Sequence, residues 1–215
     1  MFVYELVGTE QNPVYQELAA ENLGRQYTFL RSIVLTSIKL QHPMLSIEVI
    51  RALNYHAIAC LHTNVGEFRP IPVTVGTLSV PPHFQVPALM QMFTNWVNRN
   101  WDSADPVLLA AFVLWRLNAI HPFINGNGRT ARACCHMVLC LKLGGWLPGD
   151  PILPELIRAN RPEYVQALQA ADASAVAGNL DLSVLHAFLS RLLSEQLASA
   201  MPQPIAGLIA GPAAP

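Results

Sequence analysis

Apolar residues recur along most of this chain at the spacing of an α-helix. The clearest stripe lies near the C-terminal end and consists of Leu185, Phe188, Leu189, Leu192 and Leu193. Neighbours three and four residues apart fall on one face of a helix, so this stripe predicts an amphipathic helix. Pro106–Ile120 is a strongly apolar helical run that Asp105 can cap, with Pro106 at the first helical position.

The same pattern predicts a helical arrangement for nearly the whole chain. Further helices are expected as one or two between Val14 and Leu40, and as single helices over Ser46–Leu61, Pro87–Arg99, Thr130–Leu141, Pro162–Ala171 and Leu182–Ala200. The segment 66–80 differs, because short β-branched runs there are bounded by Pro and Gly. The expected fold class is therefore mainly α, a helical bundle with one short β-hairpin.

The composition narrows the function. Charged residues make up 13% of the 215 residues and hydrophobic residues 52%, which indicates a large core, an interface, or both. The net charge of −1, without a cluster of Lys and Arg, does not favour nucleic acid as a partner. No apolar run reaches the ~20 residues that span a bilayer, and the start lacks the pattern of a signal peptide. We expect no membrane partner and a cytoplasmic location, with export by a signal-independent secretion system left open.

The segment between the two central helices carries the chemistry. It reads His-Pro-Phe-Ile-Asn-Gly-Asn-Gly-Arg-Thr-Ala-Arg from His121 to Arg132. Gly126 and Gly128 allow successive N–H groups to turn around an anion, and the N-terminus of the following helix favours a phosphate there. Arg129 and Arg132 lie one helical turn apart and can reach neighbouring phosphates. His121, with an ordinary pKa near 6.5, can take a proton from an attacking hydroxyl.

This run resembles the signature His-Pro-Phe-x-(Asp/Glu)-Gly-Asn-Gly-Arg-x-x-Arg of Fic-domain proteins and departs from it at one position, Asn125. The resemblance extends at lower specificity over roughly residues 30–190, and Val73, Thr74, Val75 and Gly76 resemble the flap with which Fic proteins hold a target segment. It implies a Fic-like domain over 30–200, an N-terminal helical extension over 1–29 and a flexible tail over 201–215.

The resemblance also implies an activity: transfer of AMP, or another nucleotide monophosphate, from a nucleoside triphosphate such as ATP to a Ser, Thr or Tyr hydroxyl of a target protein. His121 would be the general base. Asn127, with the backbone of Gly126 and Gly128, would hold the α- and β-phosphates. Arg129 would neutralise the leaving pyrophosphate, and Arg132 would reach the γ-phosphate.

Asn125 stands where the family places Asp or Glu to hold Mg²⁺. An amide oxygen carries no formal charge, so Asn125 would be a weak metal ligand. Three interpretations stay open: an enzyme with weaker Mg²⁺ affinity, an enzyme for another nucleotide or metal, and a nucleotide-binding pseudoenzyme or partner-binding module. A phosphate-transferring, kinase-like relative would carry lysine at the position of Gly128, so that class is not favoured.

The sequence also gives expectations about regulation and assembly. Many Fic proteins carry an inhibitory glutamate that occupies the second arginine of the motif, and Leu40 stands where that glutamate would align. Arg132 is therefore expected to lack such a clamp. An inhibitory partner protein or a homodimer are the assemblies that the sequence suggests.

Overall fold

The computed structural model describes residues 2–42, 45–76 and 79–201, and this part of the chain is a bundle of helices. Its helices are α1 (Val3–Val7), α2 (Pro13–Lys39), α3 (Ile47–Ile58), α4 (Val86–Arg99), α5 (Pro106–Ile120), α6 (Asn127–Lys142), α7 (Leu153–Ala159), α8 (Arg161–Val176) and α9 (Ser183–Ser199), with a 3-10 turn at His83–Gln85. The mainly α fold class is confirmed.

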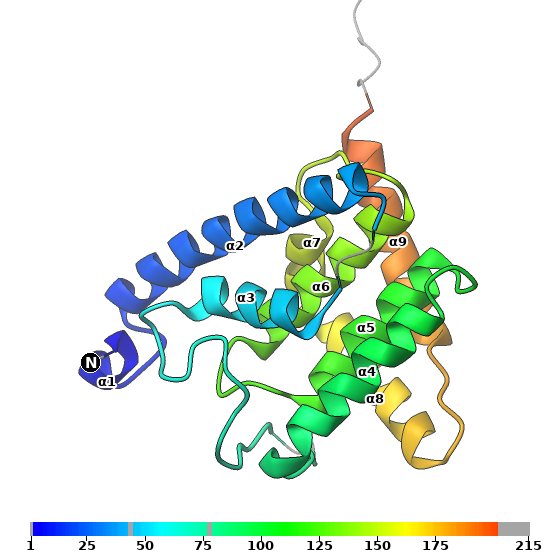
Figure 1. The fold of residues 1–215 in the computed structure, drawn as a ribbon. Coiled ribbons are helices and arrows are strands. Elements are labelled where there is room, and N and C mark those ends of the chain that lie inside the picture. The colour runs from blue at the N-terminus through cyan, green and yellow to red at the C-terminus, as the bar shows by residue number, and fades with distance from the viewer. Residues whose placement is uncertain (1, 43–44, 77–78, 202–215) are drawn as a thin grey trace, which may run out of the picture.

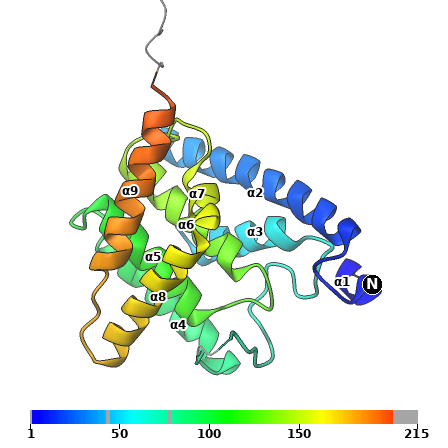
Figure 2. The same cartoon turned by 180° about the vertical axis from the view of Figure 1, so that it is seen from behind.

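The helices α5 and α6 occupy the centre of the bundle and pack against each other. Figures 1 and 2 show α2 and α3 along one side of this pair and α8 and α9 along the other. The loop that joins α5 to α6 is the segment whose chemistry the sequence singled out. It therefore starts and ends in the buried core of the fold.

The central helix α5 forms as its sequence predicts. The Asp105 carboxylate accepts a hydrogen bond from the Leu108 N–H at 2.9 Å, and Pro106 occupies the first turn. Most of its residues are buried, from Leu109 to Ile120. Each Leu, Val or Phe buried in this way contributes about 1.5–3 kcal/mol.

The C-terminal stripe behaves similarly. All five of its apolar residues lie in the core on the inner face of α9, as the helical spacing predicts.

The long helix α2 is fixed to α3 by two buried amide side chains. The Asn22 Nδ2 donates to the carbonyl of Ala59 at 2.8 Å, and the Gln26 Nε2 donates to the carbonyl of Leu53 at 2.9 Å. Both side chains are fully buried, and hydrogen bonds of this kind are expensive to break without replacement. Hydrogen bonds as well as apolar packing therefore set the position of α2 against α3.

Several elements differ from the expectation. Residues 66–76 and 79–80 contain no strand, only an isolated bridge at Val75 and a turn at Gly76, and residues 77–78 of the expected hairpin lie outside the described part. Pro70 and Pro72 lack an N–H group and cannot donate to a ladder, which explains why no regular strand forms before the turn.

The helix boundaries also differ. α6 begins at Asn127, three residues before the expected start, because Gly126 caps it, and the short helices α1 and α7 were not predicted. α2 spans residue 30, where the N-terminal helical extension was expected to meet the Fic-like domain, and that division stays a prediction. Of the predicted tail, residues 202–215 lie outside the described part. In the residues that the structure does describe, we find no helix with the length and apolarity that crossing a membrane requires.

Candidate active site

Two residues in the left-handed backbone region bracket the loop between α5 and α6. His121 ends α5 with φ 50° and ψ 60°, and Gly126 precedes α6 with φ 77°. A left-handed conformation is strained for a residue with a Cβ, so the backbone at His121 is held by its surroundings. The result is a sharp six-residue loop, 121–126, that leads into the N-terminus of α6.

Gly126 is required by contact as well as by conformation. A Cβ at this position would lie 2.7 Å from Cγ2 of Ile58 and 2.9 Å from Nδ2 of Asn54, both on α3. The loop therefore lies directly against α3. A side chain larger than hydrogen would push the start of α6 away from that helix.

Asn127 closes the loop on itself. Its Oδ1 accepts from the Phe123 N–H at 2.9 Å, and its Nδ2 donates to the Phe123 carbonyl at 2.8 Å. The Phe123 side chain is fully buried and lies beside the ring of Phe68, with 5.9 Å between ring centroids. The structure thus places the Asn127 side chain on the loop backbone, where it shapes the cradle for an anion.

A buried amide on α3 connects this loop to the turn before the expected flap. The Asn54 Nδ2 donates to the Asn125 carbonyl at 2.9 Å, and its Oδ1 accepts from the Gly66 N–H at 3.1 Å. Asn54 is fully buried, so both bonds are made away from solvent. The loop and the segment after α3 are therefore positioned by the same side chain.

His121 lies in a confined place beside Arg69. The Arg69 Nε donates to the His121 carbonyl at 2.8 Å, and its guanidinium also donates to the Pro81 carbonyl. The pKa of His121 is lowered to about 4, chiefly because the imidazole is buried; a backbone hydrogen bond at Asn118 raises the pKa, and the positive charge of Arg69 lowers it. The imidazole is therefore neutral at neutral pH and able to accept a proton.

Asn125 is already engaged by its neighbours. Its Oδ1 accepts from the Gly126 N–H at 2.6 Å and from an Nη of Arg129 at 3.0 Å, while its Nδ2 donates to the Glu10 carboxylate at 2.9 Å. Turning the amide over would set its N–H groups against those of Gly126 and Arg129, so this network fixes its orientation. An oxygen with both lone pairs occupied, one by a cation, does not fit a metal ion as a ligand. The arrangement thus does not fit Mg²⁺ at Asn125.

Arg129 is held in two places. One Nη donates to the Ala57 carbonyl in the last turn of α3 at 2.8 Å, and the other donates to Asn125. Its guanidinium is therefore fixed beside the loop rather than extended into solvent.

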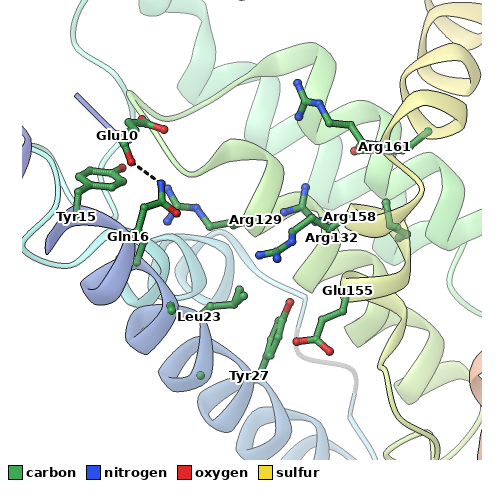
Figure 3. A pocket seen from close by; sticks show the side chains of 15 residues that line it. Glu10, Tyr15, Gln16, Leu23, Tyr27, Arg129, Arg132, Glu155, Arg158 and Arg161 are labelled. Atoms are coloured by element: carbon green, nitrogen blue, oxygen red, sulfur yellow. Dashed lines mark hydrogen bonds between the residues drawn. The ribbon is translucent and has the colours of Figure 1, made fainter. Parts of the chain in front are cut away.

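A cavity of about 630 Å³ opens on the arginine side of the loop. Figure 3 shows it between α2 and the corner where α7 meets α8. The α2 wall contributes small residues, including Ala20 and Gly24, and the aromatic residues Tyr15 and Tyr27. The volume lies within the range of pockets that bind small ligands and cofactors.

Four arginines line this cavity: Arg129 and Arg132 from α6, Arg158 from α7 and Arg161 from α8. Burial lowers the pKa of Arg132, which shows how far its guanidinium is withdrawn from water. Glu10 and Glu155 are the carboxylates among the described lining residues. The cavity therefore has an excess of positive charge, as an anionic ligand requires.

The structure brings the predicted residues together in part. Arg129 and Arg132 share the cavity, and the start of α6 with Gly126 and Gly128 lies beside them. His121 is not among the cavity's lining residues and lies on the other side of the loop, towards Arg69 and Pro81. Val73, Thr74, Val75 and Gly76 belong to the irregular segment on that second side, and their target-binding role stays a prediction.

Sequence reasoning missed three groups at this site. Glu10 reaches Asn125 across 115 positions of the chain, a contact with no local signature. Tyr15 bonds the His62 ring at 2.9 Å beside it. Arg158 and Arg161 lie on different helices, α7 and α8, so their spacing in the sequence does not show that they line one cavity with Arg129 and Arg132.

A buried helix pair joined by a glycine-rich loop, with a histidine on one side and arginines on the other, is the arrangement that the sequence resemblance to Fic-domain proteins implies. Residues 44–139 match the model of the Fic/DOC family, so this part of the chain is similar to that family.

Named relatives share sequence with part of this chain. Protein adenylyltransferase Fic of Drosophila grimshawi is 43% identical over 108 residues, which is 50% of this chain and 21% of the relative. The protein of the same name from Drosophila willistoni is 43% identical over 75 residues, or 34% of this chain and 15% of the relative. The chain thus spans about a fifth or less of the length of these relatives.

Solved structures share the fold. A Fic domain containing signaling protein from Bacteroides thetaiotaomicron is similar over 92% of this chain and 79% of its own, with a TM-score of 0.68 and 24% identity. Fic-1 of C. elegans (residues 134–508) is similar over 92% of this chain and 54% of its own, with a TM-score of 0.66 and 22% identity. At these identities the likeness establishes the fold alone.

Proposed function

We propose that this chain is a protein adenylyltransferase that moves AMP from ATP to a hydroxyl side chain of a target protein. The observation that supports it best is the division of the loop into two sides, with a neutral histidine on one and an arginine-lined cavity on the other. The name and identity of the Drosophila relatives support the same activity.

Each group has a role in this reaction. The imidazole of His121 takes the proton from the target hydroxyl, and the hydroxyl oxygen forms a bond to the α-phosphorus of ATP. The bond from that phosphorus to the bridging oxygen breaks, and pyrophosphate leaves with that electron pair. Arg129 and Arg132 neutralise the leaving group, and the first N–H groups of α6 stabilise the negative charge on the phosphates.

Positioning and charge explain why so few groups suffice. Phosphoryl centres are attacked with little covalent help from the protein, so a rigid base and a prepared anion site contribute most of the acceleration. Asn127 and Asn54 stabilise the loop shape that these two parts share. The target segment would approach from the side of residues 73–76, where His121 lies.

The test uses intact mass spectrometry. The purified protein and its His121→Ala variant are incubated with ATP, in Mg²⁺ or in EDTA, and weighed for an AMP adduct on the chain itself or on an added target. We expect an adduct with the wild type and none with the variant. An equal adduct on both would remove His121 from the reaction, and its absence from both under every condition would reject the transferase.

A second candidate is a nucleotide-binding module without turnover. It is favoured by the contacts of Asn125, whose oxygen is occupied by Gly126 and Arg129, and by the low basicity of His121. Tight ATP binding with no adduct would support this alternative.

Further parts of the proposal concern conditions and partners. Mg²⁺ is a variable of the assay, because no group at position 125 is free to hold it. Three points stay predictions: a cytoplasmic location, a homodimer and an inhibitory partner protein. Size-exclusion chromatography with light scattering tests for the homodimer.

A further inference from the structure

Two arginines outside the loop face the same cavity as those inside it. Arg158 lies in the last turn of α7, and Arg161 begins α8 three residues later. Figure 3 shows both on the side of the cavity opposite α2, with Arg158 beside Arg132. The positive charge of the site therefore comes from two separate stretches of the chain, α6 and the α7–α8 corner.

Three of the four guanidiniums are available to a ligand. Within the described residues, Arg132, Arg158 and Arg161 form no hydrogen bond and no ion pair, whereas Arg129 is held by Ala57 and Asn125. Like charges gathered around one cavity repel one another, and withdrawing Arg132 from water adds a further cost. An anion with several charged oxygens would relieve both costs at once.

The loop itself does not supply all the charge that a triphosphate needs. A carboxylate at position 125 would recruit a divalent cation to offset the phosphates, but Asn125 is neutral and its oxygen is occupied. Glu10 and Glu155 reduce the net positive charge of the cavity further. Arg158 and Arg161 restore it from the opposite wall.

We propose that Arg158 and Arg161 bind the terminal phosphates of a nucleoside triphosphate and supply the charge that a divalent cation would otherwise provide. This inference rests on the proposed function, since it takes the nucleotide to be the ligand of the cavity. Its consequence is that ATP binds with little dependence on Mg²⁺, and that ATP binds more tightly than AMP through these two side chains.

The experiment measures binding without turnover. The full-length His121→Ala protein is titrated with ATP, ADP and AMP by calorimetry, once in EDTA and once in excess Mg²⁺. Arg158→Gln and Arg161→Gln are compared in the same background with Arg99→Gln, a matched control on the exposed last turn of α4. Thermal unfolding of each variant establishes that it is folded.

We expect the Kd for ATP in EDTA to lie within about threefold of the Kd in Mg²⁺. Arg158→Gln and Arg161→Gln should each weaken ATP by roughly ten- to hundredfold, the range of a hydrogen bond between charged groups, and leave AMP nearly unchanged. Arg99→Gln should change neither. Arg158→Lys keeps the charge but not the paired donors, so its Kd for ATP should lie between those of the protein with Arg158 and the Arg158→Gln variant.

Other outcomes overturn the inference. Binding of ATP that requires Mg²⁺ would assign the charge to the metal, and an equal loss for ATP and AMP would make the two arginines structural. Either result leaves the transferase reaction untouched, since it is tested separately by the AMP adduct. Failure of every nucleotide to bind, together with no adduct, would reject the proposed function as well.

Discussion

Replacing Gly126 by alanine tests whether the loop is held against α3 by contact. The new Cβ would lie 2.7 Å from Ile58 Cγ2 and 2.9 Å from Asn54 Nδ2, and the residue would keep a φ of 77°. The left-handed backbone costs about 1–2 kcal/mol for alanine, and overpacking of this kind costs about 1–3 kcal/mol. The free energy of unfolding should therefore fall by about 2–5 kcal/mol.

A second glycine provides the control. Gly144 follows the end of α6 with φ 80°, and a Cβ there would have no heavy atom within 4 Å. Gly144→Ala thus incurs the backbone cost alone, about 1–2 kcal/mol. The difference between the two variants isolates the contact with α3, and we expect it to be about 1–3 kcal/mol.

Urea unfolding followed by circular dichroism measures both variants against the wild type. Calorimetry with ATP then reports whether the shifted loop still binds phosphate, and Gly126→Ala should weaken ATP while Gly144→Ala should not. If the two variants lose the same stability, the close approach to α3 does not constrain the loop, and the argument for its rigidity is refuted.

Three further predictions test the basicity of His121, the hydrogen bonds from Asn127 to Phe123, and the contact between Glu10 and Asn125. Because burial holds the pKa of His121 near 4, the unprotonated base persists on acidification, and kcat/KM for AMP transfer should stay level from about pH 8 down to about pH 5.5; a midpoint near 6.5 would contradict this. Asn127→Ala leaves the buried N–H and carbonyl of Phe123 without partners and should lower the free energy of unfolding in urea by about 2–4 kcal/mol. A decrease below about 1 kcal/mol would show that these two hydrogen bonds do not stabilise the loop. Asn125→Asp places a second carboxylate against Glu10 and should increase hydrogen exchange in residues 3–12, whereas the double change with Glu10→Gln should restore protection; unchanged exchange in the single variant would show that the contact does not hold this segment.

Local signals predicted the centre of this fold well. Asp105 and Pro106 mark the start of α5, and its continuous apolar run predicts a helix buried in the core. The candidate loop could also be predicted, because His121, the glycines and the two arginines lie within twelve residues. These features are short-range, so a single sequence contains them.

The missed features depend on contacts between distant parts of the chain. Glu10 and Asn125 meet across 115 positions of the chain, and no local pattern encodes this contact or the bonds from Asn22 and Gln26 that join α2 to α3. The β-hairpin was expected from β-branched residues, but the prolines beside them withhold the donors that pairing needs. The metal ligand expected at Asn125 was judged by its type, whereas its neighbours decide what its oxygen can accept.

The cavity has a consequence for how such a domain diversifies. Its loop arginines lie within residues 44–139, but its two walls, α2 and the α7–α8 corner, lie outside that range. A fragment trimmed to the matched range would keep the loop and lose both walls of the cavity that we propose as the nucleotide site. If the cavity is the nucleotide site, substitutions at Ala20, Gly24 or Arg158 would change the ligand without touching the loop, so ligand choice and chemistry could change independently.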